Sequence, residues 1–284
     1  MAGGKGTRLL PATKVISKHI MPIYDKPMIY YPLCTLMLSD IQDILIISTS
    51  RDINLFKELL KDGSQFGVNF VYMIQDKPKG IGEAFSIGKN FLADHKSTLI
   101  LGDNLFYGNS LQDKLIKASN NTGATLFSYN VSDPKEFAVL RLDENKQILG
   151  IEEKPNHPKS NLAITGLYFY DENVIDYASS LNPSNRGEYE ITELNNIYLK
   201  EGALKVEELR RGFTWIDAGT HKNYLEANQF VSTIQNRQGL TISCPEEIAF
   251  EKGWIDLSKL YEQAIEQGSS YYGQYLMKII SNYS

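Results

Sequence analysis

Three glycines and an arginine stand close together at the start of the chain. Gly3, Gly4 and Gly6 occupy three of four consecutive positions, and Arg8 follows two residues later. Glycine lets backbone N–H groups turn inward and approach an anion closely, and the guanidinium of Arg8 is a planar fork that suits phosphate oxygens. The spacing matches neither the GxxxxGK(S/T) loop of ATPases nor the GxGxxG loop of dinucleotide-binding domains. The segment is a candidate phosphate-binding loop, and a flexible N-terminal stretch is the alternative.

A lysine follows this loop in apolar surroundings. Lys18 lies ten residues beyond Arg8. Such a side chain either runs its apolar stem along the surface with its ammonium in water, or it aims a point charge into a cleft. Taken alone, Lys18 favours the surface arrangement.

Two aspartates come directly after apolar runs that are typical of strands. Asp103 follows 98–101 and a glycine, and Asp217 follows 213–216. Ligands of open α/β sheets bind beyond the carboxyl ends of strands, so both acids are candidate ligands. They are 114 residues apart in the sequence, and only the fold could bring them together. Two carboxylates with substrate phosphate oxygens make a typical Mg²⁺ site. Taken alone, however, Asp217 is better interpreted as a cap of the helix that begins near Thr220.

Further polar groups stand at the ends of two other predicted strands. Glu153 and Lys154 close the strand predicted at 148–153. Neighbouring residues of a strand point to opposite faces, so both side chains enter one pocket only if the strand ends or twists at Glu153. Solvated charge is the alternative. Gln75, ahead of Gly80, could read the edge of a base with its amide group, and an ordinary polar loop is the alternative.

Strands and helices alternate through the first half of the chain, which favours a parallel, doubly wound sheet. The predicted strands are 43–48, 70–75, 98–102 and 124–131, and the predicted helices are 28–39, 53–60, 82–91 and 110–118. Closely spaced strands follow at 137–142, 148–153 and 163–170, helices return at 190–201 and 220–237, and the chain is helical from Glu246 onward, with breaks at Gly253 and Gly268. We therefore predict one α/β domain with a mostly parallel, Rossmann-like sheet, an antiparallel insertion and a helical C-terminal tail. A doubly wound domain ordinarily opens with a strand, so we expect the first strand to be missing ahead of the glycine-rich loop.

Composition excludes several classes of protein. The 284 residues carry a net charge of −5, which gives no broad electrostatic attraction to nucleic acid or to an anionic membrane. Two cysteines cannot form a disulfide framework, and four scattered histidines argue against a zinc site. No apolar run approaches the roughly 18 residues of a spanning helix. We expect a cytoplasmic enzyme that binds neither nucleic acid nor membrane.

The order of the motifs along the chain closely resembles the glucose-1-phosphate thymidylyltransferase family of sugar nucleotidyltransferases, also called dTDP-glucose pyrophosphorylases. The resemblance covers essentially the whole chain. It rests on AGGKGTRL at 2–9, SK at 17–18, YDKPMIYYP at 24–32, LGDN at 101–104, EEKP at 152–155, TGLYFY at 165–170, RGE at 186–188, EIT at 190–192, WID at 215–217 and CPEEIA at 244–249.

The resemblance implies a reaction in which dTTP and α-D-glucose 1-phosphate give dTDP-glucose and pyrophosphate, with Mg²⁺ as cofactor. It implies a nucleotide-binding half at 1–130, a sugar-phosphate-binding half at 131–240 and a helical tail at 241–284. The implied catalytic residues are Arg8, Lys18 and Lys154, and the implied metal ligands are Asp103 and Asp217. The implied nucleotide-binding residues are Ala2, Gly3, Gly4, Gly6, Thr7, Arg8 and Lys18, with Gln75 and Gly80 at the thymine. The implied sugar-phosphate-binding residues are Ala138, Glu153, Lys154 and Tyr168. The family also implies a homotetramer in dTDP-rhamnose and deoxysugar synthesis that is inhibited by the end product.

The chain departs from the family pattern at a few positions. His19 and Glu83 stand where glutamine is usual, Ala218 stands where threonine is usual, and Ala138 replaces a glycine. Ala138 motivates an alternative in which the enzyme uses another hexose 1-phosphate, or UTP. A truncated, catalytically impaired or regulatory homologue is the alternative from another class.

Overall fold

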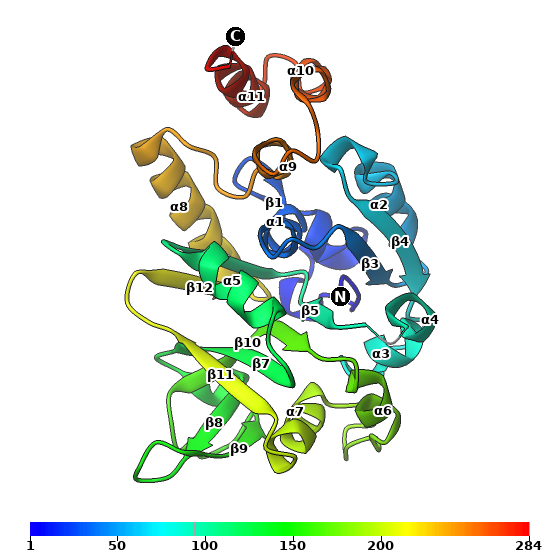
Figure 1. The fold of residues 1–284 in the computed structure, drawn as a ribbon, viewed down its shortest axis with the longest axis vertical. Coiled ribbons are helices and arrows are strands. Elements are labelled where there is room, and N and C mark those ends of the chain that lie inside the picture. The colour runs from blue at the N-terminus through cyan, green and yellow to red at the C-terminus, as the bar shows by residue number, and fades with distance from the viewer. Residues whose placement is uncertain (94, 284) are drawn as a thin grey trace. The chain divides into compact units, whose positions relative to one another are not determined.

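The computed structural model describes residues 1–93 and 95–283 (Figure 1). These residues divide into two compact units, each assembled from several stretches of chain. The first unit consists of Met1, 75–93, 95–101 and 108–215, and the second consists of 2–74, 102–107 and 216–283. The single domain expected from the sequence stays a prediction.

The first unit is built on a six-stranded sheet with the strand order β11-β7-β10-β8-β9, in which β10 also pairs with β5. Its strands are β5 (Ser97–Ile100), β7 (Ala124–Asn130), β8 (Ala138–Leu142), β9 (Ile148–Glu153), β10 (Leu162–Tyr170) and β11 (Leu204–Leu209). Nearly all of β10 is buried, because strands pair with it on both edges and packed side chains cover both faces. The α/β class and the antiparallel insertion are confirmed.

The prediction of a mostly parallel sheet is wrong for this unit. The pairing of β7 with β11 is parallel, but β10 runs antiparallel to β5, β7 and β8, and β8 runs antiparallel to β9. The reason is the insertion: the β8–β9 hairpin reverses the chain, and β10 then enters the sheet against the direction of β5 and β7.

Short helices accompany this sheet. They are α3 (Glu83–Ile87), α4 (Lys89–Leu92), α5 (Leu111–Ser119), α6 (Val174–Ser179) and α7 (Ile191–Lys200). The single helix predicted at 82–91 is wrong, since two helices meet at Gly88. Glycine gains no side-chain contacts and loses the most backbone freedom in a helix, so an interruption costs least there.

The second unit combines a parallel strand pair with helices. The pair is β3 (Asp43–Ser48) with β4 (Asn69–Ile74), and α2 (Ile53–Leu60) connects the two strands. A short hairpin of β1 (Pro22–Ile23) and β2 (Lys26–Pro27) precedes α1 (Tyr30–Leu38). The strand predicted at 43–48 and the helix predicted at 53–60 are confirmed residue for residue.

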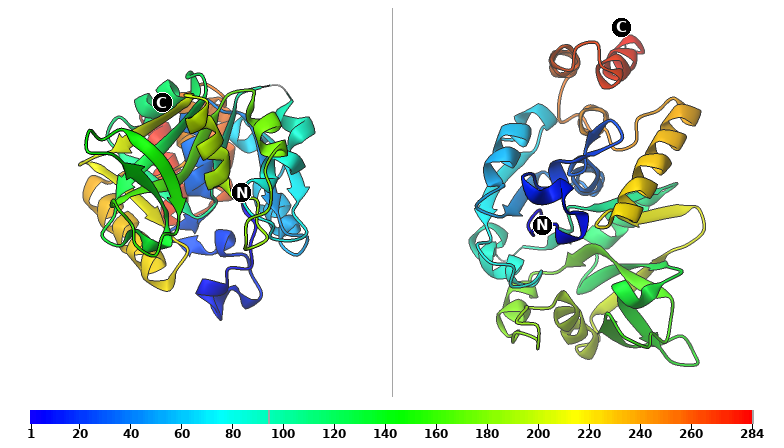
Figure 2. Two further views of the ribbon diagram at one scale, coloured as in Figure 1. Left: turned by 90° about the horizontal axis from the view of Figure 1, so that it is seen from below. Right: turned by 180° about the vertical axis from the view of Figure 1, so that it is seen from behind.

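Four helices complete the second unit, and the last three of them form the predicted helical tail. They are α8 (His221–Gln238), α9 (Pro245–Glu251), α10 (Leu257–Glu266) and α11 (Tyr271–Ser281). The last two lie against each other (Figure 2), and α9 packs on α1. A buried apolar cluster that includes Ile23, Met28 and Val231 joins α8 to the β1–β2 hairpin and to α1. Among the described residues, no helix combines the length and the apolar character that crossing a membrane requires.

Two further strands pair in a separate ladder and carry the candidate acids. These strands are β6 (Asn104–Gly108) and β12 (Phe213–Asp217). Asp103 immediately precedes β6, and Asp217 is the last residue of β12. The ladder therefore brings together two positions that are far apart in the sequence.

Candidate functional site

Asp103 and Asp217 lie side by side in the second unit. The backbone N–H of Ala218 donates to the carbonyl oxygen of Asp103 at 2.9 Å and joins the two strand ends. An alanine Cβ at Gly219 would lie 2.8 Å from Asp217 Oδ1 and 3.3 Å from Asp103 Oδ2. Both carboxylates thus border the same small space, and glycine keeps that space open.

Two cations border this space as well. Lys18 Nζ forms an ion pair with Asp103 Oδ2, and the Lys18 side chain is only 15% exposed. Arg8 Nη2 lies 2.8 Å from the position of a Cβ at Gly219. The surface arrangement favoured for Lys18 from its neighbours alone is therefore wrong. Its partner is 85 residues away in the sequence, where no local pattern could reveal it.

Asp217 was interpreted either as a metal ligand or as a helix cap, and the structure gives the cap to another residue. Thr220 is the N-cap of α8, and its side chain accepts a hydrogen bond from the backbone N–H of Asn223 at 3.2 Å. Asp217 Oδ1 accepts the backbone N–H of Gly219 at 2.9 Å. The capping interpretation of Asp217 is therefore wrong.

The pKa values of the two carboxyl groups are shifted in opposite directions. Burial, followed by the nearby charge of Asp103, raises the pKa of Asp217 to about 6, although Lys18 and Arg8 oppose this. Burial also acts to raise the pKa of Asp103, but Lys18, His19 and hydrogen bonds outweigh it and hold that pKa below its usual range. Two acids forced together in this way favour the approach of a cation.

The donor set of this site fits a hard divalent cation. The described residues contain no group of three or more histidine, cysteine or acidic side chains that could enclose a metal. Mg²⁺, however, is commonly held by one or two carboxylates and completes its octahedron with substrate phosphates and water. Asp103 and Asp217 supply such a pair, with oxygen donors only.

The glycine-rich loop is anchored at both ends in the second unit. The N–H of Ala2 donates to Ile47 O at 2.8 Å, and Ser48 Oγ donates to Ala2 O at 2.9 Å. At the other end, Thr13 Oγ1 donates to Gly6 O at 2.7 Å. Gly4 and Gly6 have φ values of +101° and +59°, which side chains disfavour. The alternative of a loose N-terminal stretch is wrong, because both ends are hydrogen-bonded.

Three further residues of this loop, Gly3, Thr7 and Arg8, are at least partly exposed to solvent. Gly3 is partly buried, whereas Thr7 and the side chain of Arg8 are exposed in a short 3-10 turn.

His19 is buried, with Ser17 Oγ 3.1 Å from its ring Nδ1. Burial, followed by the charge of Lys18, lowers the pKa of His19 to about 3. His19 is therefore neutral at physiological pH and adds no positive charge to the phosphate loop.

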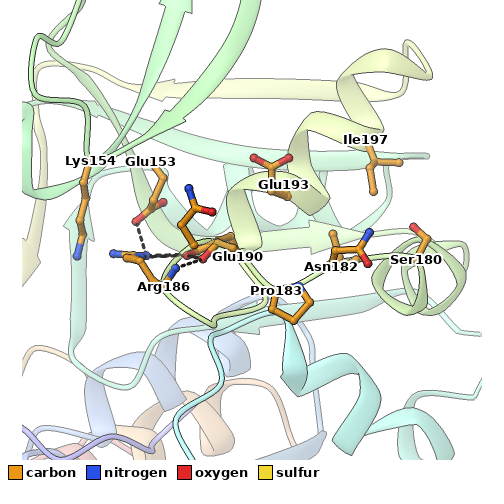
Figure 3. A pocket seen from close by; sticks show the side chains of 12 residues that line it. Glu153, Lys154, Ser180, Asn182, Pro183, Arg186, Glu190, Glu193 and Ile197 are labelled. Atoms are coloured by element: carbon orange, nitrogen blue, oxygen red, sulfur yellow. Dashed lines mark hydrogen bonds and ion pairs between the residues drawn. The ribbon is translucent and has the colours of Figure 1, made fainter.

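The first unit contains a cavity of about 660 Å³ (Figure 3). Its lining includes Glu153 and Lys154 at the end of β9, Arg186, and Glu190 and Glu193 at the start of α7. Lys154 has a φ of +42°, and its N–H donates to Phe137 O at 3.1 Å. The strand therefore ends at Glu153. Glu153 and Lys154 were expected to reach one pocket only if the strand ended or twisted there, and both line the cavity.

Arg186 is a prominent cation of this cavity to which the sequence analysis assigned no role. Its Nη2 lies 2.9 Å from both carboxylate oxygens of Glu190, and Figure 3 shows it between Glu190 and Glu153. Glu188 is 3.3 Å away and Glu153 is 3.7 Å away. In the sequence, Arg186 and Glu190 are four residues apart with a glycine between them. This spacing suggests an ion pair, but it does not indicate a cavity.

The other residues expected at the sugar phosphate lie on the same sheet. Ala138 is the cross-strand partner of Glu153 in the β8–β9 hairpin. Tyr168 is buried in β10, where its ring stacks on Tyr170 with 6.3 Å between the ring centres. Neither belongs to the residues that line the cavity.

The residues expected at the base are held in a fixed loop of the first unit. Gln75 is buried, and its Nε2 donates to Gly80 O at 3.1 Å. Gly80 has a φ of +96°, and a Cβ there would lie 2.5 Å from Tyr189 O. The N–H of Tyr189 donates to Lys79 O at 2.7 Å, so the backbone fixes this loop against the chain that leads into α7.

Comparisons with known proteins agree with one another. A family profile described as "Nucleotidyl transferase" matches residues 1–234. The chain is 51% identical over 277 residues to the glucose-1-phosphate thymidylyltransferase of Xanthomonas campestris pv. campestris (strain B100), which covers 97% of this chain and 94% of that protein. It is 50% identical to the glucose-1-phosphate thymidylyltransferase of Neisseria meningitidis serogroup A, covering 99% of this chain and 98% of that protein.

A solved structure gives the same family, and a second one shares the fold. A Bacillus anthracis protein described as a glucose-1-phosphate thymidylyltransferase, crystallised with a sucrose, matches with a TM-score of 0.74 at 41% identity. The match covers 81% of this chain and 92% of that protein. A UDP-glucose pyrophosphorylase with bound UDP-glucose shares the fold at a TM-score of 0.72 and 23% identity. The chain belongs to the nucleotidyl transferase family and, within it, to the glucose-1-phosphate thymidylyltransferases.

Proposed function

We propose that this chain transfers dTMP from dTTP to α-D-glucose 1-phosphate and releases dTDP-glucose and pyrophosphate. The observation that carries the proposal is the convergence of two buried carboxylates, Asp103 and Asp217, with the cations Lys18 and Arg8 around one small space. Relatives that are about half identical over nearly the whole chain carry the name of this activity, which supports the choice of substrates.

The proposed reaction is a direct displacement at phosphorus. An oxygen of the sugar phosphate attacks the α-phosphorus of dTTP, and the bond from that phosphorus to the oxygen bridging it to the β-phosphorus breaks. Both partners are anions, so the chain must bring them together and stabilise charge on the departing pyrophosphate. Arg8 and Lys18 serve this purpose beside the loop of Ala2, Gly3, Gly4, Gly6 and Thr7. No general base is required, because the attacking phosphate is already ionised.

Asp103 and Asp217 would hold the divalent cation, for which we propose Mg²⁺. When bound, such an ion neutralises phosphate oxygens and aligns them for displacement. Lys18 already neutralises Asp103 in the structure, so the lysine is placed to move between the carboxylate and a phosphate oxygen. Arg8 is placed to contact the triphosphate beside Asp217.

The first unit would supply recognition. Lys154 would bind the sugar phosphate, and Glu153 would accept hydrogen bonds from sugar hydroxyls, with Ala138 and Tyr168 nearby on the sheet. Thr192 Oγ1 donates to Glu153 Oε2 at 2.6 Å and fixes that carboxylate. Gln75 and Gly80 would recognise the thymine.

We also propose the wider setting that the family resemblance implies. The enzyme would be a cytoplasmic homotetramer that makes dTDP-glucose for dTDP-rhamnose and other deoxysugars. Cys34 and Cys244 are both buried and unpaired, as in proteins of reducing compartments. Exposed apolar side chains on α10 and α11, including Ile265 and Tyr271, offer surface for contacts between subunits.

A turnover assay tests the proposal. Release of pyrophosphate is measured with dTTP, UTP and the other nucleoside triphosphates, each combined with several hexose 1-phosphates, with and without Mg²⁺. We expect Mg²⁺-dependent release that is fastest with dTTP and glucose 1-phosphate. A higher kcat/KM with another sugar phosphate would support the alternative that the methyl group of Ala138, opposite Glu153, motivates. A folded chain that releases no pyrophosphate would be a regulatory homologue.

A further inference from the structure

We propose that Glu83 is a positioning residue that fixes the orientation of the Gln75 amide and thereby selects nucleotides whose base carries an imide N–H. The inference rests on the proposed function, since it concerns the loop that would recognise the base. It adds a residue to which neither the sequence analysis nor the comparisons give a role.

Both N–H groups of the Gln75 amide are directed at acceptors. Nε2 donates to Glu83 Oε2 at 2.8 Å and to Gly80 O at 3.1 Å. A carboxylate and a backbone carbonyl accept hydrogen bonds and donate none. If the amide were turned over, Gln75 Oε1 would face two other oxygen lone pairs. The orientation therefore follows from the chemistry of the two partners and is independent of how the amide atoms are assigned.

The carbonyl oxygen of Gln75 is left for a ligand. Within 1–93 and 95–283, Gln75 Oε1 has no hydrogen-bond partner, although the residue is only 7% exposed. The oxygen is not one of the described side-chain atoms that are both buried and without a hydrogen-bond partner, so it is open to solvent and to a donor from a ligand. The site thus presents an acceptor and no donor from this side chain.

Glu83 itself is held in place from two sides. It is the first residue of α3, and the N–H of the preceding Gly82 donates to Tyr189 O at 2.9 Å, which fixes the start of the helix. Lys79 Nζ lies 3.6 Å from Glu83 Oε1, the carboxylate oxygen that Gln75 does not use. The carboxylate therefore cannot easily turn away from the amide.

An acceptor at this place discriminates between pyrimidines. Thymine and uracil carry a donor at N3, whereas N3 of cytosine is an acceptor and would oppose Gln75 Oε1. The resemblance places glutamine at position 83, and a glutamine side chain can either accept or donate. With glutamine there, only the carbonyl oxygen of Gly80 would still oppose a turned-over Gln75 amide, so the amide would gain freedom to turn. Glu83 removes that freedom in this chain.

The test compares nucleotide binding by the full-length chain in Mg²⁺ without sugar phosphate. Dissociation constants for dTTP and dCTP are measured by titration calorimetry for the wild type, Glu83→Gln, Glu83→Ala and Asp76→Asn. Asp76→Asn is the matched control, because it removes one negative charge from an exposed acid of the same loop, and the hydrogen bonds of the Gln75 side chain within the described residues go to Glu83 and Gly80 instead. Melting temperatures verify that each variant folds.

We expect both Glu83 variants to reduce the preference for dTTP over dCTP by about tenfold, with Asp76→Asn unchanged. In Glu83→Gln the change should come mainly from tighter dCTP binding, which a loss of structure would not produce. An unchanged preference in both Glu83 variants would overturn the inference about Glu83 and leave the proposed function intact. A wild type that binds dTTP selectively but never transfers dTMP would contradict the proposed function alone, and one that binds neither nucleotide would contradict both.

Discussion

Lys18 Nζ is paired with Asp103 Oδ2, so a cation expected at the phosphates and an acid expected at the metal neutralise each other in the structure. Asp217, on the other side of the same space, forms no ion pair within 4 Å among the residues that the structure describes, and its pKa is raised by burial and by Asp103. The asymmetry is consistent with the proposed binding of a further cation between the two acids. Variants of either acid should therefore affect metal-dependent steps more than the fold.

Asp103→Asn tests the role of the buried acid. The substitution keeps the shape of the side chain but removes the charge of one proposed metal ligand. We expect kcat to fall at least about 100-fold, with a melting temperature close to that of the wild type, because Lys18 retains a polar partner. Asp113→Asn on the exposed face of α5 serves as the control. Full activity of Asp103→Asn at saturating Mg²⁺ would contradict the assignment.

Lys154→Ala tests the cavity of the first unit. Lys154 leaves β9 with its side chain at the cavity and is exposed in the structure. Loss of a cation that binds a phosphate should raise the KM for glucose 1-phosphate by about tenfold or more and change the KM for dTTP much less. Steady-state kinetics with each substrate varied in turn measure this difference, and Lys159→Ala, an exposed lysine of the following loop, is the control. A larger effect on dTTP would assign Lys154 to the nucleotide instead.

Gly219→Ala tests the open space between the two acids. The new methyl group would lie 2.8 Å from both Arg8 Nη2 and Asp217 Oδ1. The nearest atoms are ends of side chains, so the fold should survive while the phosphate and metal site is displaced. We expect dTTP binding in the presence of Mg²⁺ to weaken by about tenfold, with little change in melting temperature. Gly150→Ala, whose Cβ would meet only the flexible end of Arg141 at 3.3 Å, should bind dTTP like the wild type.

Local elements of the fold were predictable because their signals are local. The strand at 43–48 is a continuous apolar run bounded by polar residues, and the helix at 53–60 places Ile53, Phe56 and Leu60 on one buried face. The direction of β10 was not predictable, since pairing depends on where the β8–β9 hairpin returns the chain. The same holds for β11, which pairs with β7 across a gap of more than 70 residues and has no clear apolar alternation.

The sequence allowed us to predict which residues belong to the site, but only in part which of them contact one another. Asp103 and Asp217 were expected to meet on the strength of the family resemblance, while their own neighbours favoured a helix cap for Asp217. The apolar neighbours of Lys18 in the sequence favoured a side chain with its ammonium in water. The structure instead pairs this ammonium with Asp103. Arg186 carried no expected role, because its cavity is lined by residues 180–186 together with α7 and the end of β9, and the sequence keeps β9 and α7 more than 30 residues apart.

Glu247→Gln tests an effect of pH on stability in the helical tail, away from the proposed site. Burial, opposed by a hydrogen bond from Tyr275 and assisted by Glu251 and Glu246, raises the pKa of Glu247 from 4.5 to about 7. The folded chain therefore holds a proton that the unfolded chain releases between these values, and the free energy of unfolding should fall as the pH rises from about 4.5 to 7. Glutamine is neutral throughout and can still accept from Tyr275 Oη, which lies 2.6 Å from Glu247 Oε1. Urea unfolding at pH 5 and pH 8 should show the variant gaining about 2 kcal/mol on the wild type between the two conditions, and an equal change in both proteins would contradict the raised pKa.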